Sequence, residues 1–157
     1  MMHDQTDHGS PVAALVIREA MTWVGTPYRH QAGRKSVGCD CLGLVRGVWR
    51  GLYGFDLELP DAYAADWAEV GGEEKLLAGA QRNFREKEPS AVQPGDLLLF
   101  RWRPHLPAKH AGILITEHSF IHAYQGGGSV TVSALVPQWR KRIAAAFAFP
   151  EFPDIST

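Results

Sequence analysis

Hydrophobic residues recur at helical spacing near the start of the chain. The spacing predicts a helix that opens at Ser10 and Pro11, an N-cap followed by a proline in the first helical position, and that ends at Gly25. Its expected apolar face consists of Val12, Leu15, Val16, Met21 and Val24. Residues 1–9 are expected to form a loose tail.

Two further helices are expected, one on each side of an irregular stretch at residues 55–72. The first covers residues 41–54 and follows a polar loop at 29–38. Its apolar face is made of Leu44, Val45, Val48, Trp49 and Leu52. The other helix covers residues 73–84, and its apolar positions are Leu76, Leu77, Ala80 and Phe84.

The pattern changes at Gln93-Pro94-Gly95-Asp96, which is typical of a turn. The short apolar runs that follow predict antiparallel strands at residues 97–102, 111–116, 119–124, 129–135 and 144–149. Helices first and strands afterwards indicate an α+β fold, with the N-terminal helices packed on an antiparallel sheet of about five strands. We expect a single domain at residues 10–150 and a short tail at 151–157.

The composition excludes several classes of protein. A chain of 157 residues with 45% hydrophobic and 21% charged residues is typical of one packed domain. The net charge of −1 lacks the basic excess of a nucleic-acid binder. The sequence contains no run of about 18 apolar residues, so no membrane span is expected. The polar N-terminus has no apolar signal core, so synthesis in the cytoplasm without a signal peptide is expected.

Cys41 is a candidate nucleophile because it stands at the expected start of the second helix. The partial positive charge of a helix N-terminus lowers a thiol pKa, and the N–H of Cys41 itself can stabilise an oxyanion. His110 opens an expected strand, and His122 lies in the next one, so a hairpin would make the two imidazoles neighbours. Nucleophile, base and orienting group are the parts of a catalytic triad.

Each of these residues also has an ordinary structural explanation. A free cysteine is more often a small buried residue, and a histidine within a strand is more often a satisfied core residue. Cys39 and Cys41 are separated by one residue, which disfavours a disulfide between them. A zinc site made of these cysteines, His110 and His122 is an alternative, but Cys-x-Cys is not the usual ligand spacing. We therefore expect no metal and no cofactor.

Four separated segments resemble, in the same order, the motifs of the NlpC family of cell-wall cysteine peptidases. They are Tyr28-Arg29 with Gly38-Cys39-Asp40-Cys41-Leu42-Gly43-Leu44-Val45, then Pro94-Gly95-Asp96-Leu97-Leu98-Leu99-Phe100, His110-Ala111-Gly112-Ile113, and Phe120-Ile121-His122-Ala123. The resemblance covers residues 14–149 and implies a papain-like α+β core.

The resemblance also implies roles for the matching residues. Cys41 would be the nucleophile, His110 the general base and later the acid, and His122 the residue that orients His110. Tyr28 would line the site and contribute to the oxyanion hole or to substrate binding, and Asp40 would help to recognise the peptide end of the substrate. The implied substrate is a peptidoglycan stem peptide, cut between γ-linked D-glutamate and the diamino acid that follows.

The chain departs from the family pattern at Leu42, where a serine is usual, and Cys39 is an additional thiol. The chain most resembles short members encoded with phage tails or gene-transfer particles, which implies tail proteins as partners and action at the wall of a recipient cell. A non-catalytic tail component, and an amidase, transpeptidase or acyltransferase on the same fold, remain alternatives.

Overall fold

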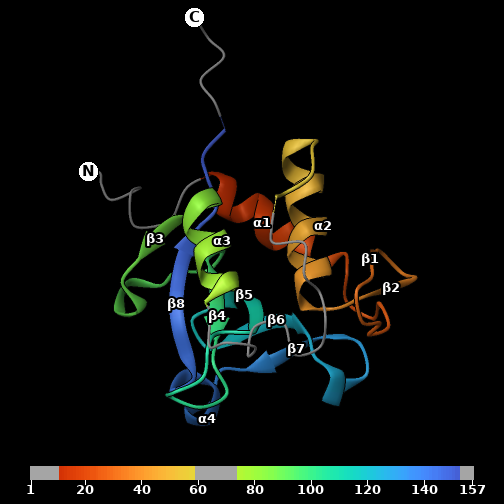
Figure 1. The fold of residues 1–157 in the computed structure, drawn as a ribbon. Coiled ribbons are helices and arrows are strands. Elements are labelled where there is room, and N and C mark those ends of the chain that lie inside the picture. Colours follow the sequence, from red (N-terminus) through yellow and green to blue (C-terminus); the bar gives the residue numbers. More distant parts are fainter. Residues whose placement is uncertain (1–10, 59–73, 153–157) are drawn as a thin grey trace, which may run out of the picture.

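The structure is a computed structural model that describes residues 11–58 and 74–152 (Figure 1). Several expectations lie outside the described residues. These are the tail at 1–9, the N-cap at Ser10, most of the irregular stretch at 55–72, the start of the third helix at Glu73, and the end of the C-terminal tail.

Three of the described α-helices correspond to the expected ones. They are α1 (Pro11–Met21), α2 (Cys41–Tyr53) and α3 (Lys75–Asn83), and a fourth, unexpected helix is the short α4 (Pro137–Arg140). The start and end of α2 are as expected: Gly54 has the left-handed φ of 82° and its N–H donates to the carbonyl of Arg50. Two short 3-10 turns, η3 (Pro89–Ala91) and η4 (Gln125–Gly127), lie in the connections.

The prediction for α1 was wrong in its end and in part of its apolar face. The helix stops at Met21, four residues before Gly25, and Leu15, Met21 and Val24 are exposed. Val12 and Val16 are buried as expected, and Ala20 and then Trp23 are buried as well. A spacing of four residues lets the small Ala20 continue the stripe, and Trp23 then fills the space beyond the last turn.

The described strands form one antiparallel six-stranded sheet, with the order β3-β8-β4-β5-β6-β7, and a separate two-stranded hairpin. The sheet strands are β3 (Arg85–Lys87), β4 (Leu97–Phe100), β5 (His110–Thr116), β6 (Ser119–Ala123), β7 (Val130–Ala134) and β8 (Ile143–Ala148). About five strands were expected, and the additional strand is β3, a short polar strand at the edge of the sheet. The sequence analysis missed β3 because its residues show no alternation of apolar and polar positions.

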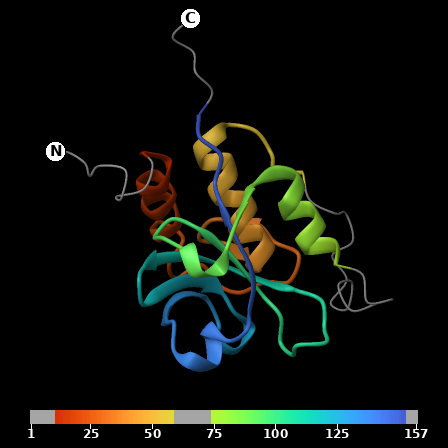
Figure 2. The same cartoon turned by 90° about the vertical axis from the view of Figure 1, so that its left-hand side faces the viewer.

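The sheet buries side chains on both faces. The three N-terminal helices pack on one face, against residues such as Leu99, Ala111 and Ile113. The other face carries Phe100 and Phe120 with other apolar residues, and Trp139 from α4 packs against them. Figures 1 and 2 show α4 on the side of the sheet opposite to α1 and α2.

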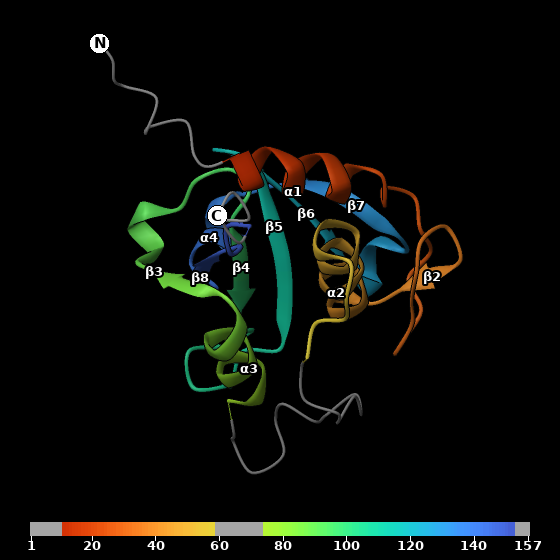
Figure 3. The ribbon, with the colours of Figure 1, turned by 90° about the horizontal axis from the view of Figure 1, so that it is seen from above.

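The hairpin consists of β1 (Gly33–Arg34) and β2 (Gly38–Cys39) and overlaps the segment at 29–38 that was expected to be a loop. Its turn contains Ser36 at a φ of 68°, an unusual value for a residue other than glycine. Seen from above, the hairpin extends from the N-terminal end of α2 (Figure 3). The second strand of the hairpin therefore ends two residues before Cys41.

Candidate active site

Asp40 fixes the backbone immediately before Cys41. It is the N-cap of α2: its Oδ1 accepts a hydrogen bond of 2.8 Å from the N–H of Gly43. Its Oδ2 accepts a second bond of 2.8 Å from the N–H of Gln31. Because the side chain is 5% exposed and both oxygens are engaged, Asp40 joins the preceding loop to the start of the helix.

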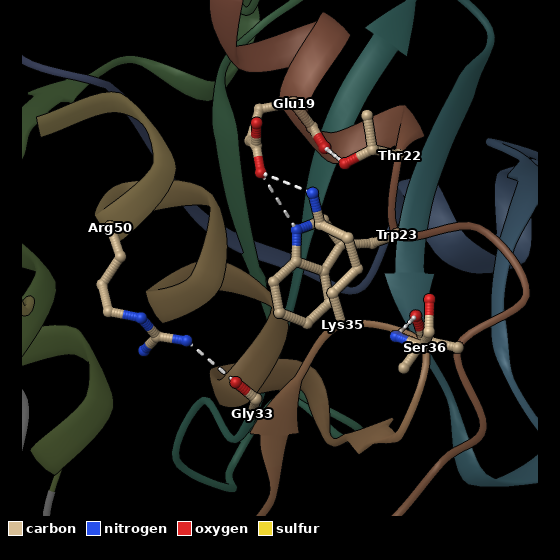
Figure 4. A network of polar contacts seen from close by, with 8 residues as sticks. Glu19, Thr22, Trp23, Gly33, Lys35, Ser36 and Arg50 are labelled. Carbon is tan, nitrogen blue, oxygen red and sulfur yellow. Dashed lines mark hydrogen bonds and ion pairs between the residues drawn. The ribbon is translucent and has the colours of Figure 1, made fainter. Parts of the chain in front are cut away.

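The hairpin before Cys41 is held from two sides by polar contacts (Figure 4). On one side, the carboxylate of Glu19 in α1 accepts from the Lys35 ammonium at 3.1 Å and from the Trp23 indole at 3.4 Å. On the other, the Arg50 guanidinium of α2 donates to the Gly33 carbonyl at 2.8 Å. The two helices therefore set the position of the segment that leads to the thiol.

The thiol of Cys41 lies against the start of β5. Its Sγ is 4.0 Å from the carbonyl oxygen of Lys109, and the N–H of Ala111 is directed at it, together with those of Leu42 and Cys41 itself. Lys109 and Ala111 are the two neighbours of His110. The fold therefore brings the expected nucleophile to the backbone that carries the expected base, 68 residues away from Lys109 in the sequence.

The expected lowering of the thiol pKa by backbone N–H groups at the helix N-terminus is outweighed in this arrangement. Burial, and secondly the neighbouring carboxylate of Asp40, raise the pKa of Cys41 to about 12. The three backbone N–H groups act in the opposite direction, but they do not outweigh the loss of water. The resting thiol is therefore protonated at neutral pH.

His110 and His122 form a hydrogen-bonded pair, as the sequence predicted. The Nε2 of His110 lies 2.9 Å from the Nδ1 of His122, and the Nε2 of His122 lies 2.8 Å from the Oγ of Ser133. Since Nε2 of His110 is engaged with His122, Nδ1 is the nitrogen of His110 that this hydrogen-bonded pair leaves unused. Nothing in the sequence pattern had singled out Ser133.

Both imidazoles are neutral in the folded protein at neutral pH. His110 is 4% exposed and His122 is fully buried. Burial, and secondly the neighbouring His122, lower the pKa of His110 to about 3. Burial alone lowers the pKa of His122 to about 4. A neutral imidazole has a free ring nitrogen with which it can accept a proton.

Gly112 makes room for His122 between the strands. A Cβ at Gly112 would lie 2.9 Å from the Phe120 ring and 3.3 Å from the Cβ of His122. The register pairs Ile113 with Ile121, which places His110, Gly112 and His122 on the same face of the sheet. The glycine of the His-Ala-Gly-Ile motif therefore has a packing reason, because any side chain there would displace β6.

Aromatic rings enclose the histidine pair, and the sequence predicted this only in part. Trp102, which was expected at the end of a strand and follows β4 instead, stacks on His110 with centroids 5.3 Å apart. Tyr124 stacks on His122 at 5.4 Å, and Trp139 contacts both imidazoles at 5.8 and 5.2 Å. Trp139 was missed because it is distant in sequence from both histidines, and Tyr124, two residues after His122, was not singled out by any motif.

Tyr28 lies beside the thiol. Its N–H donates to the Gly128 carbonyl at 3.0 Å, and its backbone bridges to Cys39. Burial raises the pKa of its hydroxyl to about 12, and the adjacent Cys41 and Asp40 act in the same direction. Cys39 is fully buried in the core, so its side chain lies away from solvent.

Two further expectations concern groups of residues. Within residues 11–58 and 74–152, no three His, Cys, Asp or Glu side chains are grouped as metal ligands. Over the same ranges, every helix is too short or too polar to reach across a bilayer. The roles of Cys41, His110, His122, Tyr28 and Asp40 in catalysis stay predictions.

Comparison with known proteins gives a consistent picture. The model of the NlpC/P60 family matches residues 25–147. The murein DD-endopeptidase MepS/murein LD-carboxypeptidase of Escherichia coli (strain K12) is 30% identical over 131 residues, which cover 83% of this chain and 60% of the relative. The gamma-DL-glutamyl hydrolase of Bacillus subtilis (strain 168) is 30% identical over 135 residues, which cover 85% of this chain and 29% of that protein.

The fold has a close counterpart among solved structures. The crystal structure of the NlpC/p60 domain of the peptidoglycan hydrolase SagA is similar with a TM-score of 0.63 and 26% sequence identity. The similarity covers 87% of this chain and 98% of that domain. The chain thus spans nearly all of that isolated domain, but only 60% and 29% of the lengths of the two curated relatives.

Proposed function

Because this chain belongs to the NlpC/P60 family, we propose that it is a cysteine peptidase that hydrolyses peptides of the bacterial cell wall. The observation that carries the proposal is the placement of the Cys41 thiol against the two neighbours of His110, whose Nε2 is 2.9 Å from His122. A thiol, a base and a group that orients the base are the parts that thioester chemistry needs.

The reaction begins with proton transfer from the Cys41 thiol to Nδ1 of His110 as the sulfur attacks the amide carbonyl. Because burial keeps both groups neutral at rest, the proton moves together with the attack and not before it. The N–H of Cys41 stabilises the oxyanion, and His110 then protonates the leaving amine. Water, activated by the same imidazole, hydrolyses the thioester and restores the thiol.

The neighbouring side chains would bind the substrate. We assign Tyr28, beside the thiol, to the oxyanion hole or to the wall of the substrate site. We assign Asp40 to recognition of the peptide end, in addition to its capping of α2, which already engages both of its oxygens with backbone N–H groups.

The bond that we propose is the one between γ-linked D-glutamate and the following diamino acid of a stem peptide. The name of the Bacillus subtilis relative supports a γ-glutamyl bond, whereas the name of the Escherichia coli relative describes DD-endopeptidase and LD-carboxypeptidase activities. Leu42 stands where the family usually has a serine, and its side chain is buried. Product identification must therefore decide between these bonds.

The test is a digest of diaminopimelate-containing sacculi, with released fragments identified by mass spectrometry. Wild-type protein should release fragments with new stem-peptide ends, Cys41→Ala should release none, and Cys39→Ala should act like wild type. Release by Cys41→Ala would overturn the assignment of the nucleophile. No release by any of the three would favour a non-catalytic component, and a product joined to an added amine would favour transpeptidation.

Delivery as part of a phage tail or gene-transfer particle, after synthesis in the cytoplasm, stays a proposal of its own. It rests on the resemblance of the motifs to short, tail-associated members. Its test is to purify particles from cells that carry the gene and to detect the chain in them with an antibody. Particles that lack the chain would contradict the proposal.

A further inference from the structure

We propose that Ser133 is a positioning residue that accepts the Nε2 proton of His122 and so supports the reactive tautomer of His110. The geometric part of the inference stands on the hydrogen bonds alone, while its consequence for catalysis rests on the proposed function. Neither the sequence motifs nor the comparisons assign any role to this serine.

Ser133 reaches His122 diagonally across two paired strands. The register of β6 and β7 pairs His122 with Thr131 and Phe120 with Ser133. Residues 131 and 133 therefore both lie on the face of the sheet that carries His122. The hydrogen bond of 2.8 Å goes from the Nε2 of His122 to Ser133, although Thr131 is the direct partner.

The chain of three side chains permits only two arrangements of protons. In the first, His110 carries its proton on Nε2 and donates to Nδ1 of His122, which then carries its own proton on Nε2 and donates to the Ser133 oxygen. In the second, every bond runs in reverse, and the proton of His110 lies on Nδ1. Only the first leaves Nδ1 of His110 able to accept the proton of Cys41.

Protonation of His110 imposes the same requirement. An imidazolium carries protons on both nitrogens, so its Nε2 must donate to Nδ1 of His122, and His122 must then donate from its Nε2. His122 is fully buried, so that N–H needs an acceptor within the protein, and the Ser133 hydroxyl provides it. The serine is therefore required in the resting reactive form and in the protonated form alike.

The surroundings contain few groups that would set the tautomer instead. Among the described residues, the titratable side chain in ring contact with both imidazoles is that of Tyr124, directly after β6, and the two imidazoles also contact each other. Arg142 lies over the rings of Trp102 and Trp139, with its guanidinium 5.6 and 5.7 Å from their centroids. None of these is the partner of the Nε2 of His122.

The direct test is the ¹⁵N chemical shifts of the imidazoles in the full-length, ¹⁵N-labelled protein at neutral pH. The inference expects protonated Nε2 and unprotonated Nδ1 in both His110 and His122. The Ser133→Ala variant should lose this single pattern, Ser133→Thr should restore it, and Thr131→Val should leave it unchanged. Wild-type protein with protonated Nδ1 in His122, or unchanged shifts in Ser133→Ala, would overturn the inference.

The expected effect on catalysis is tested by measuring the hydrolysis of cell-wall fragments by the same variants. Ser133→Ala should lower kcat about tenfold, the effect of about one hydrogen bond, with little change in KM, and Ser133→Thr should recover most of it. Full activity of Ser133→Ala would contradict the catalytic role. If the wild type hydrolyses no wall fragment, the proposed function fails, while the ¹⁵N shifts still decide the tautomer.

Discussion

The indole of Trp102 stacks on the imidazole of His110, with ring centroids 5.3 Å apart and planes inclined by 26°. The stack covers one face of the histidine that we assign as the general base. Trp102 is itself partly exposed, so it separates His110 from water. Because loss of water is the main cause of the lowered pKa of His110, the tryptophan contributes to keeping that imidazole neutral.

Replacement of Trp102 should therefore raise the pKa of His110 towards its ordinary value. In Trp102→Ala, we expect the acidic limb of kcat/KM against pH to move to higher pH, because water reaches the imidazole and favours its charged form. Trp102→Phe keeps an aromatic ring in place and should leave the limb close to that of the wild type. An acidic limb unchanged in Trp102→Ala would mean that other groups desolvate His110.

The buried histidines should make the fold sensitive to acid. Burial lowers the pKa values of His110 and His122 to about 3 and 4, below the 6.5 of an unfolded histidine. Between these values the unfolded chain binds protons that the folded chain does not, so stability is complete above pH 6.5 and falls as the pH decreases towards 4. Each histidine contributes a slope of about 1.4 kcal/mol per pH unit at most.

Urea unfolding at pH 7 and pH 5 measures this slope. The His122→Gln variant should have a lower free energy of unfolding than the wild type at pH 7. Between pH 7 and pH 5 its free energy of unfolding should decrease less than that of the wild type, since one buried base has been removed. His118→Gln is the matched control, because the side chain of His118 is 85% exposed at the β5–β6 turn. Equal acid sensitivity of His122→Gln and the wild type would contradict the assignment.

The protonated state of Cys41 at rest can be tested by alkylation. Because burial raises its pKa to about 12, the rate with iodoacetamide should be low at pH 7 and should still rise between pH 9 and pH 10. The Cys39→Ala variant should show the same pH dependence, because Cys41 is still present. The Cys41→Ala variant retains only Cys39, which is fully buried, and should therefore resist labelling until it unfolds. A rate that levels off below pH 8 would indicate a thiolate in the free protein.

The places of Cys41, His110 and His122 in the fold were predictable from the sequence because short-range patterns encode them. The apolar face of α2 placed Cys41 at a helix start, and the spacing of His110 and His122 about a two-residue turn made them neighbours in a hairpin. Both inferences depend only on the periods of helix and strand. The same reasoning gave the strands that follow Asp96, within one or two residues at their ends.

Other features depend on contacts between segments distant in sequence. The polar strand β3 exists because its residues pair with β8, about 60 residues later. The aromatic enclosure of His110 combines Trp102, which follows β4, with Trp139 of α4. The raised pKa of Cys41 also arises from burial by the whole fold. Local helix geometry alone predicted the opposite direction.

Asp40 provides a test that separates its capping of α2 from its influence on the thiol. Asp40→Ala removes the acceptors of the Gly43 and Gln31 N–H groups, which we expect to cost about 2–3 kcal/mol in urea unfolding. Asp40→Asn keeps one oxygen as an acceptor and should lose about half of that. Gln93, whose own N–H is bonded to Asp96, lies in a different turn, so Gln93→Ala should leave α2 unaffected.

The charge of Asp40 should matter even where its cap survives. Its carboxylate raises the pKa of Cys41, so the neutral Asp40→Asn side chain should lower that pKa and speed alkylation at pH 8 to 9. If Asp40 also binds the peptide end of the substrate, Asp40→Asn should raise KM with a smaller change in kcat. An unchanged KM together with faster alkylation would confine the residue to capping and electrostatics, because a lost contact to substrate would have to appear in KM.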